Sequence, residues 1–167
     1  MITKYLPTFK VFEVGSLTGL RAGHMLSQRP AHADIKKVEK NGYNFIENGI
    51  IVGLNADGTV GNFDKSAHKV AFVHYTEELN TFMDELKYYA LPVEEVGATY
   101  PRCIALYAGD EFCTNNVAAD VDNAVAAKVV DGVLTLQTAA DDDSLFAVSA
   151  STLPTGEKAY DFVFLGV

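Results

Sequence analysis

Short runs of β-branched and aliphatic residues, interrupted by glycine-containing turns, constrain the fold of this chain more than any other feature of its sequence. In NGIIVGLNADGTVGNF (48–63) two such runs flank Asp57-Gly58, and in VVDGVLTLQT (129–138) two flank Asp131-Gly132. An Asp-Gly pair supplies the positive φ values of a tight hairpin turn, and apolar runs on both sides are typical of paired strands. The sequence therefore predicts two hairpins, with these four residues in structural turn positions.

Most other segments also favour strands. KVAFVHY (69–75) carries branched and aromatic residues on both faces, which predicts a central strand that is buried on both sides. TFKVFEV (8–14) alternates and is expected to end at Gly15. Further strands are predicted in 22–26, 102–108, 124–130, 144–150 and 158–167. The chain is therefore expected to be mainly β.

One segment has helical periodicity. In TEELNTFMDELKYY (76–89), Thr76 is a good N-cap, the glutamates after it complement the helix dipole, and Pro92 ends the pattern. The apolar residues of this segment recur at helical spacing, and they are Leu79, Phe82, Met83 and Leu86. We expect an amphipathic helix near 77–90. Its apolar stripe is expected to be a core or interaction face, because such a stripe is far more often a packing surface than a cofactor site.

The two halves of the chain present similar features in the same order. Each has a strand ended by glycine, a polar excursion, an Asn-Gly or Asp-Gly turn before an aliphatic run, and a strand containing phenylalanine. We expect two small barrel- or sandwich-like β halves, 1–91 including the helix and 92–167, related by a weak internal duplication. The identities are few, so a chance likeness between two β-rich halves is the open alternative.

The charge balance limits the classes of partner. A chain of 167 residues with a net charge of −9 repels phosphate backbones, so nucleic-acid binding is not expected. The first residues lack the apolar core of a signal peptide, and no apolar run reaches the length of a membrane span. We therefore expect no membrane partner and synthesis in the cytoplasm.

The sequence contains no recognised catalytic or metal-binding motif. The four histidines are His24, His32, His68 and His74, and none has a paired-ligand spacing. His74 lies in an apolar run, where a hydrogen-bonded, half-buried side chain is expected. The Asp141–Asp143 triplet lacks the calcium-loop pattern, so a solvated loop is favoured over a bound cation. We therefore predict no catalytic residue, no metal site and no cofactor.

The second half also resembles a known family. YPRCIALYAGDEFCTNNV (100–117), followed by the Asp-Gly hairpin and by SLFAVSASTLPTGEKAYDFVFL (144–165), is similar to proteins encoded beside the major capsid protein in tailed bacteriophages. Those proteins show the same succession of a strand, Gly-Asp with Phe-x-Thr-Asn after it, a hairpin, and a final strand after a Pro-x-Gly-like turn. The first half is compatible with this group through GIIVGLNADGTVGNFD (49–64) and AFVHYTEELN (71–80).

The resemblance implies an auxiliary head protein, that is, a capsid decoration protein or the base of a head fibre. Such a protein would be non-enzymatic and would decorate or stabilise the capsid by binding the lattice of the major capsid protein. It would lie on the virion exterior after assembly in the host cytoplasm, and a homo-oligomer is compatible with that role. The apolar stripe from Leu79 to Leu86 would form either the core between the halves or the lattice contact.

Two other functions remain open. A β-rich module of a tail or cell surface would bind a ligand or carbohydrate by stacking on tyrosines, although the absence of tryptophan weakens this alternative. The candidate tyrosines are Tyr88, Tyr89, Tyr100 and Tyr107. A small enzyme would pair His24 or His74 with a carboxylate in a cleft.

Overall fold

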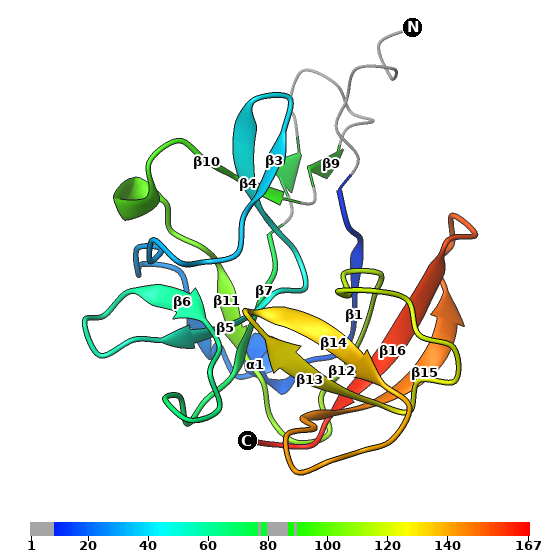
Figure 1. Ribbon diagram of the computed structural model, residues 1–167. Coiled ribbons are helices and arrows are strands. Elements are labelled where there is room, and N and C mark those ends of the chain that lie inside the picture. Colours follow the sequence, from blue (N-terminus) through cyan, green and yellow to red (C-terminus); the bar gives the residue numbers. More distant parts are fainter. Residues whose placement is uncertain (1–8, 77, 80–86, 89) are drawn as a thin grey trace, which may run out of the picture.

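Antiparallel sheets make up most of the regular secondary structure, which confirms the mainly β prediction (Figure 1). The computed structural model describes residues 9–76 and 90–167, together with the backbone at 78–79 and 87–88. Helical structure within these residues is short. It consists of α1 (Thr18–Arg21) and the 3₁₀ helix η2 (Val96–Ala98).

The largest sheet has six strands in the order β1-β12-β16-β15-β13-β14. Their bounds are β1 (Phe12–Ser16), β12 (Glu111–Thr114), β13 (Ala126–Val130), β14 (Val133–Gln137), β15 (Phe146–Thr152) and β16 (Lys158–Phe164). Alternation along the strands turns one face inward and collects phenylalanines there. Phe112 is opposite Phe162 in the register, with their rings stacked at 5.3 Å between centroids, and the Phe146 ring meets Phe162 edge-on. The core of this sheet is therefore aromatic.

The second sheet has five strands in the order β2-β11-β7-β5-β6. Their bounds are β2 (Met25–Leu26), β5 (Ile51–Leu54), β6 (Val60–Asn62), β7 (Phe72–His74) and β11 (Cys103–Ala105). Strand β7 pairs with β11 on one side and with β5 on the other, and Val73 and His74 are fully buried. The predicted central strand is thus confirmed, although it is shorter than 69–75.

Two smaller sheets complete the fold (Figure 1). One pairs β10 (Ala90–Val93) with β4 (Tyr43–Glu47), and β4 with β3 (Val38–Lys40). The other pairs β8 (Glu78–Leu79) with β9 (Lys87–Tyr88).

The helix predicted near 77–90 is wrong where the structure describes this segment. The backbone of Glu78–Leu79 and of Lys87–Tyr88 forms antiparallel strands, and Ala90 begins a strand paired with β4. Tertiary pairing outweighs a helical periodicity that rests on weak local propensities. Leu79 therefore lies in β8, with its side chain outside the described part, whereas Phe82, Met83 and Leu86 lie outside the described residues altogether.

The sheets interleave the two predicted halves. Strand β1 comes from the first half but pairs with β12, and β11 comes from the second half but lies between β2 and β7. A boundary between residues 91 and 92 falls inside β10, and one core cluster includes Phe12 and Val73 as well as Phe162. Pairing between strands distant in sequence joins the two segments around a shared core, and the internal duplication stays a prediction.

Both predicted hairpins form, but their turns differ. Strands β13 and β14 are joined by two residues, Asp131 and Gly132, with φ of 50° and 78°, as predicted. In the β5–β6 hairpin only Gly58 has a positive φ, at 83°. Asp57 acts instead through its carboxylate, which accepts hydrogen bonds from Thr59 N–H at 2.9 Å and Thr59 Oγ1 at 2.7 Å. These bonds from Thr59 hold the pKa of Asp57 below its ordinary value.

Candidate interaction groove

The Asp131-Gly132 turn is the point where the β13–β14 hairpin contacts the five-stranded sheet. The Ile51 N–H donates a hydrogen bond to the Gly132 carbonyl oxygen over 2.8 Å. A Cβ atom at Gly132 would lie 2.5 Å from Oδ1 of Asn62. Gly132 therefore satisfies two requirements, the positive φ of the turn and the close approach of Asn62.

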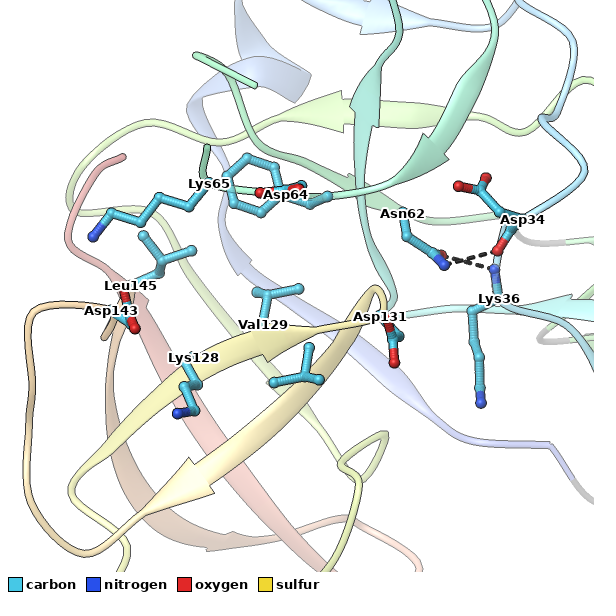
Figure 2. Close-up of a pocket in the computed structure, with 12 residues that line it drawn as sticks. Asp34, Lys36, Asn62, Asp64, Lys65, Lys128, Val129, Asp131, Asp143 and Leu145 are labelled. Carbon is cyan, nitrogen blue, oxygen red and sulfur yellow. Dashed lines mark hydrogen bonds between the residues drawn. The ribbon is translucent and has the colours of Figure 1, made fainter. Parts of the chain in front are cut away.

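The Asn62 amide fixes a second segment beside this turn. Its Oδ1 accepts the Lys36 N–H at 2.8 Å, and its Nδ2 donates to the Asp34 carbonyl oxygen at 2.7 Å (Figure 2). Because the two bonds use both ends of the amide, they set its orientation. Residues 34–36 are thereby placed next to the hairpin, although they are distant from it in sequence.

A groove with a volume of about 730 Å³ opens along the hairpin (Figure 2). Residues 34–36, the end of β6 with the segment after it, strand β13 and the segment before β15 all contribute. The lining residues are Asp34, Lys36, Asn62, Phe63, Asp64, Lys65, Lys128, Val129, Val130, Asp131, Asp143 and Leu145. A second hollow of about 380 Å³ shares Lys36, Val130 and Asp131 with the first, so the two lie on either side of the turn.

Two of the four aspartates in the groove are engaged by neighbours in their own loops. The Asp64 carboxylate accepts bonds from Ser66 Oγ at 2.7 Å and Ser66 N–H at 2.8 Å, which hold the pKa of Asp64 below its ordinary value. Asp34 Oδ1 lies 2.6 Å from His32 Nδ1. Asp131 and Asp143 are the two whose carboxylates have no bonded partner within the described part of the chain.

The lysines of the groove form fewer hydrogen bonds and ion pairs with described residues than Asp34 and Asp64 do. Lys65 donates to the carbonyl oxygen of Asp142. The Nζ atoms of Lys36 and Lys128 make no hydrogen bond or ion pair within the described residues, whereas an ion pair of this type does join Lys158 and Asp122, at 3.3 Å. Unpaired ammonium groups in a groove are available to carboxylates of another molecule.

A buried polar junction lies deeper between the sheets. Asn48 bonds both backbone groups of Thr76, accepting from its N–H at 2.8 Å and donating to its carbonyl oxygen at 2.7 Å. Asn116 Nδ2 donates to the Asn48 carbonyl oxygen at 2.7 Å. These amides satisfy buried backbone groups at the meeting of three segments, so they stabilise the fold.

The histidines are not brought together. His74, predicted to be half-buried and hydrogen-bonded, is fully buried, and its Nδ1 donates to the Arg102 carbonyl oxygen at 2.9 Å. Its Nε2 has no hydrogen-bond partner among the described residues, and burial lowers the pKa of His74 to about 4. His68 accepts the Asp64 N–H at Nδ1 over 2.9 Å. No group of three or more potential ligands for a metal ion occurs among the described residues.

His24 and the thiols offer no activated nucleophile or base. His24 Nδ1 bonds the Tyr107 hydroxyl on the surface. Burial raises the pKa of the Cys103 thiol to about 12, and burial followed by the nearby Asp161 carboxylate raises that of Cys113 to about 11. Both thiols are therefore protonated at neutral pH.

Hydrogen bonds within the Asp141–Asp143 loop and with Gln137 hold the loop in place. Asp141 accepts a bond from Gln137 Nε2 at 2.6 Å, and its Oδ1 accepts the Asp143 N–H at 2.9 Å. All three aspartates are exposed. These contacts agree with the predicted solvated loop.

The sequence did not indicate the groove, because its residues come from four separate segments with no shared motif. Of the tyrosines proposed to stack on a ligand, Tyr100 is 51% exposed and Tyr107 is 39% exposed, and the side chains of the other two lie outside the described part. No described helix is long and apolar enough to cross a bilayer. No protein-family model, curated protein or solved structure matches the chain.

Proposed function

We propose that this chain is a non-enzymatic capsid decoration protein of a tailed bacteriophage, which binds the lattice of the major capsid protein. The proposal starts from the resemblance carried by residues 100–117 and 144–165. One structural observation supports it: three polar residues of the first of these segments, Asp110, Thr114 and Asn116, make hydrogen bonds inside the protein.

Asp110 carries much of this internal bonding. Its Oδ1 accepts the Thr18 N–H at 3.0 Å and the Thr18 hydroxyl at 2.7 Å, and its Oδ2 accepts the Tyr107 N–H at 2.9 Å. Thr114 Oγ1 donates to the Val11 carbonyl oxygen at 2.6 Å. Together with Asn116, these residues tie the amino-terminal segments to the six-stranded sheet. Residues used in this way favour a rigid body that presents surfaces over a site that performs chemistry.

A repeated lattice makes a modest contact sufficient. The surface of one small domain gives limited affinity for a single lattice site. If the sites are independent, each one is filled according to that affinity, and the capsid is covered when the protein is concentrated enough. If a copy is also linked to its neighbours, the second contact becomes intramolecular and the total affinity rises by orders of magnitude. Decoration therefore requires only a rigid surface that is complementary to one position in the lattice.

Sedimentation tests the proposal directly. Purified protein is mixed at micromolar concentration with undecorated heads of the phage whose genome encodes the chain, and the heads are pelleted. We expect saturable co-sedimentation at a fixed ratio of copies to capsid protein. Heads that already carry the protein serve as the control and should take up no more. Absence of the protein from the pellet at micromolar concentration would contradict the proposal.

One observation favours the alternative of a carbohydrate-binding module. The exposed ring of Tyr100 lines a hollow of about 400 Å³ together with Glu94 and Glu95, and an aromatic face beside carboxylates is a common arrangement in sugar sites. A glycan array separates the two functions. Binding that is lost in Tyr100→Ala but kept in Tyr107→Ala would favour the carbohydrate module over the capsid role.

A further inference from the structure

The groove beside the β13–β14 hairpin contains an open strand edge. The hairpin closes at Val130 and Val133 around a two-residue turn, so these residues form a hydrogen-bonded pair. Bonded and non-bonded pairs alternate along an antiparallel ladder. The next pair, Val129 and Leu134, is therefore non-bonded, and the N–H and C=O of Val129 point away from β14.

Other outward groups of the hairpin have partners. The Leu134 carbonyl oxygen accepts the Ala118 N–H at 2.9 Å, and the Ala127 carbonyl oxygen accepts the Leu145 N–H at 2.9 Å. Val129 lies beyond the point where β15 stops pairing with β13, since that ladder covers only Ala126 and Ala127. Neither its N–H nor its C=O has a partner within the described part of the chain. Both belong to a residue that lines the groove (Figure 2).

The cations of the groove are placed around this edge. Lys128 precedes Val129 on the same strand, Lys65 lies on the opposite wall, and Lys36 lies near the turn (Figure 2). These are three of the 13 basic residues of a chain with a net charge of −9. None of the three forms an ion pair with a described carboxylate, although Lys128 attracts the exposed Asp141 carboxylate electrostatically. The two aspartates with unengaged carboxylates, Asp131 and Asp143, lie in the same lining.

We propose that this groove binds an extended acidic segment of a partner protein, which adds as a short strand to the edge of β13 at Val129. The backbone of the segment would bond the Val129 N–H and C=O, as in other cases of strand addition. Its carboxylates would meet Lys36, Lys65 and Lys128. Under the proposed function, on which this identification of the partner rests, the segment belongs to the major capsid protein.

The remaining aspartates specify the segment more narrowly. Side chains alternate between the two faces of a strand, so a segment with acids at every second position presents one acidic face and one neutral face. Asp131 and Asp143 would repel a chain that is acidic at every position. The groove therefore favours carboxylates that alternate with neutral residues, and its three lysines disfavour basic segments.

The open edge is tested without any partner by amide hydrogen exchange. In the free protein the Val129 N–H is expected to exchange at least tenfold faster than the N–H of Lys128 and Val130, which are bonded to β14. The probe is a labelled decapeptide of alternating Glu and Thr, and saturating amounts of it should remove the difference. Equal protection of the three amides in the free protein would overturn the proposal.

Charge reversal tests the role of the lysines. In fluorescence polarisation the Glu-Thr peptide should bind better than the matching Lys-Thr peptide, and binding should weaken at least tenfold in Lys36→Glu combined with Lys128→Glu. Lys10→Glu combined with Lys69→Glu is the matched control, because both lysines are exposed, neither lines the groove, and the change in net charge is the same. Equal binding of both peptides, no binding of either, or unchanged binding in the double variant would each overturn the groove proposal.

Sedimentation with undecorated heads separates this proposal from the proposed function. Wild-type protein that pellets with heads, together with a double variant that does not, supports both. If both proteins pellet equally, the groove is not the capsid contact, although the decoration role stands. If wild-type protein does not pellet, the decoration role fails, and the peptide and exchange measurements alone decide whether the groove accepts a strand.

Discussion

The two large sheets are both antiparallel, but they bury different kinds of side chain in the core that they share. The six-stranded sheet buries Phe112, Phe146 and Phe162 in mutual ring contact. The five-stranded sheet buries His74 in its central strand instead. The aromatic interior stabilises by area and ring packing and is insensitive to pH, whereas the other depends on a neutral imidazole.

The difference indicates that the two sheets contribute to the free energy of unfolding through different interactions. The aromatic cluster buries large rings in mutual contact, so truncation there should cost most. Polar side chains of both sheets, such as Asn62 in β6 and Thr114 in β12, join segments distant in the sequence. The Gly132 turn is the place where the β13–β14 hairpin contacts that sheet. Mutations in the aromatic cluster, in the five-stranded sheet and at the Gly132 turn should therefore differ in how much they lower the free energy of unfolding and in the pH dependence of that loss.

Truncation of the aromatic cluster should have the largest effect. Phe162→Ala removes a ring that contacts both Phe112 and Phe146 and leaves a cavity in a buried face. We expect the free energy of unfolding to fall by about 3 to 5 kcal/mol in urea titration. Val163→Ala, on the other face of the same strand, should cost about 1 kcal/mol or less. Equal losses in the two variants would mean that the aromatic interior is not the main source of stability.

The five-stranded sheet should lose stability as the pH falls. The folded pKa of His74 is lowered from 6.5 to about 4 by burial, so the folded state binds fewer protons than the unfolded state between these values. The contribution is complete above about pH 6.5 and is lost as the pH falls toward 4. At about 1.4 kcal/mol per pH unit, the total is on the order of 3 kcal/mol.

The control for this pH effect is a variant without the imidazole. His74→Gln retains an N–H donor for the Arg102 carbonyl oxygen but cannot gain a proton. Its unfolding free energy should vary less between pH 6.5 and 4 than that of the wild type, whereas Phe162→Leu should keep the wild-type slope. A His74→Gln protein with the wild-type slope would assign the pH dependence to other groups.

Local patterns predicted those elements whose neighbours in space are also neighbours in sequence. The Asp131-Gly132 hairpin and the strands around it follow from turn chemistry and alternation. The same reasoning could have found a further hairpin at Asn41-Gly42, where φ is 54° and 82°, between β3 and β4. It was missed because the flanking residues alternate weakly and several are polar.

Contacts between distant segments could not be predicted in this way. No local signal pairs β1 with β12 or places β11 between β2 and β7. The expected helix failed for the same reason, since its described residues and Ala90 pair as strands. The groove likewise brings together Lys36, Lys65 and Lys128 only after the sheets have assembled, so no local pattern in the sequence relates these lysines to one another.

The contact between the two sheets should show an intermediate effect. Gly132→Ala places a Cβ at a positive φ and 2.5 Å from Asn62 Oδ1, so we expect a loss of about 2 to 3 kcal/mol in urea titration. In an Asn62→Ala background the contacts with Oδ1 and Cγ are absent, only the Cβ of residue 62 at 3.3 Å remains, and the strain of the turn is unchanged. There the same change should cost about 1 kcal/mol. An identical loss of unfolding free energy in both backgrounds would show that the Asn62 side chain does not clash with the added Cβ.

The smallest expected effect is at Gly58, the corresponding turn of the five-stranded sheet. Its φ of 83° resembles that of Gly132, but the nearest atom to an added Cβ is the flexible end of Arg29, at 3.2 Å. Gly58→Ala should therefore cost about 1 kcal/mol, from backbone strain alone. This value should match that of Gly132→Ala in the Asn62→Ala background, because both changes then measure an alanine at positive φ in an uncrowded turn. If Gly58→Ala costs as much as Gly132→Ala in the wild-type protein, the two turns do not differ in their tertiary contacts, and the hairpin would lose its special role in joining the sheets.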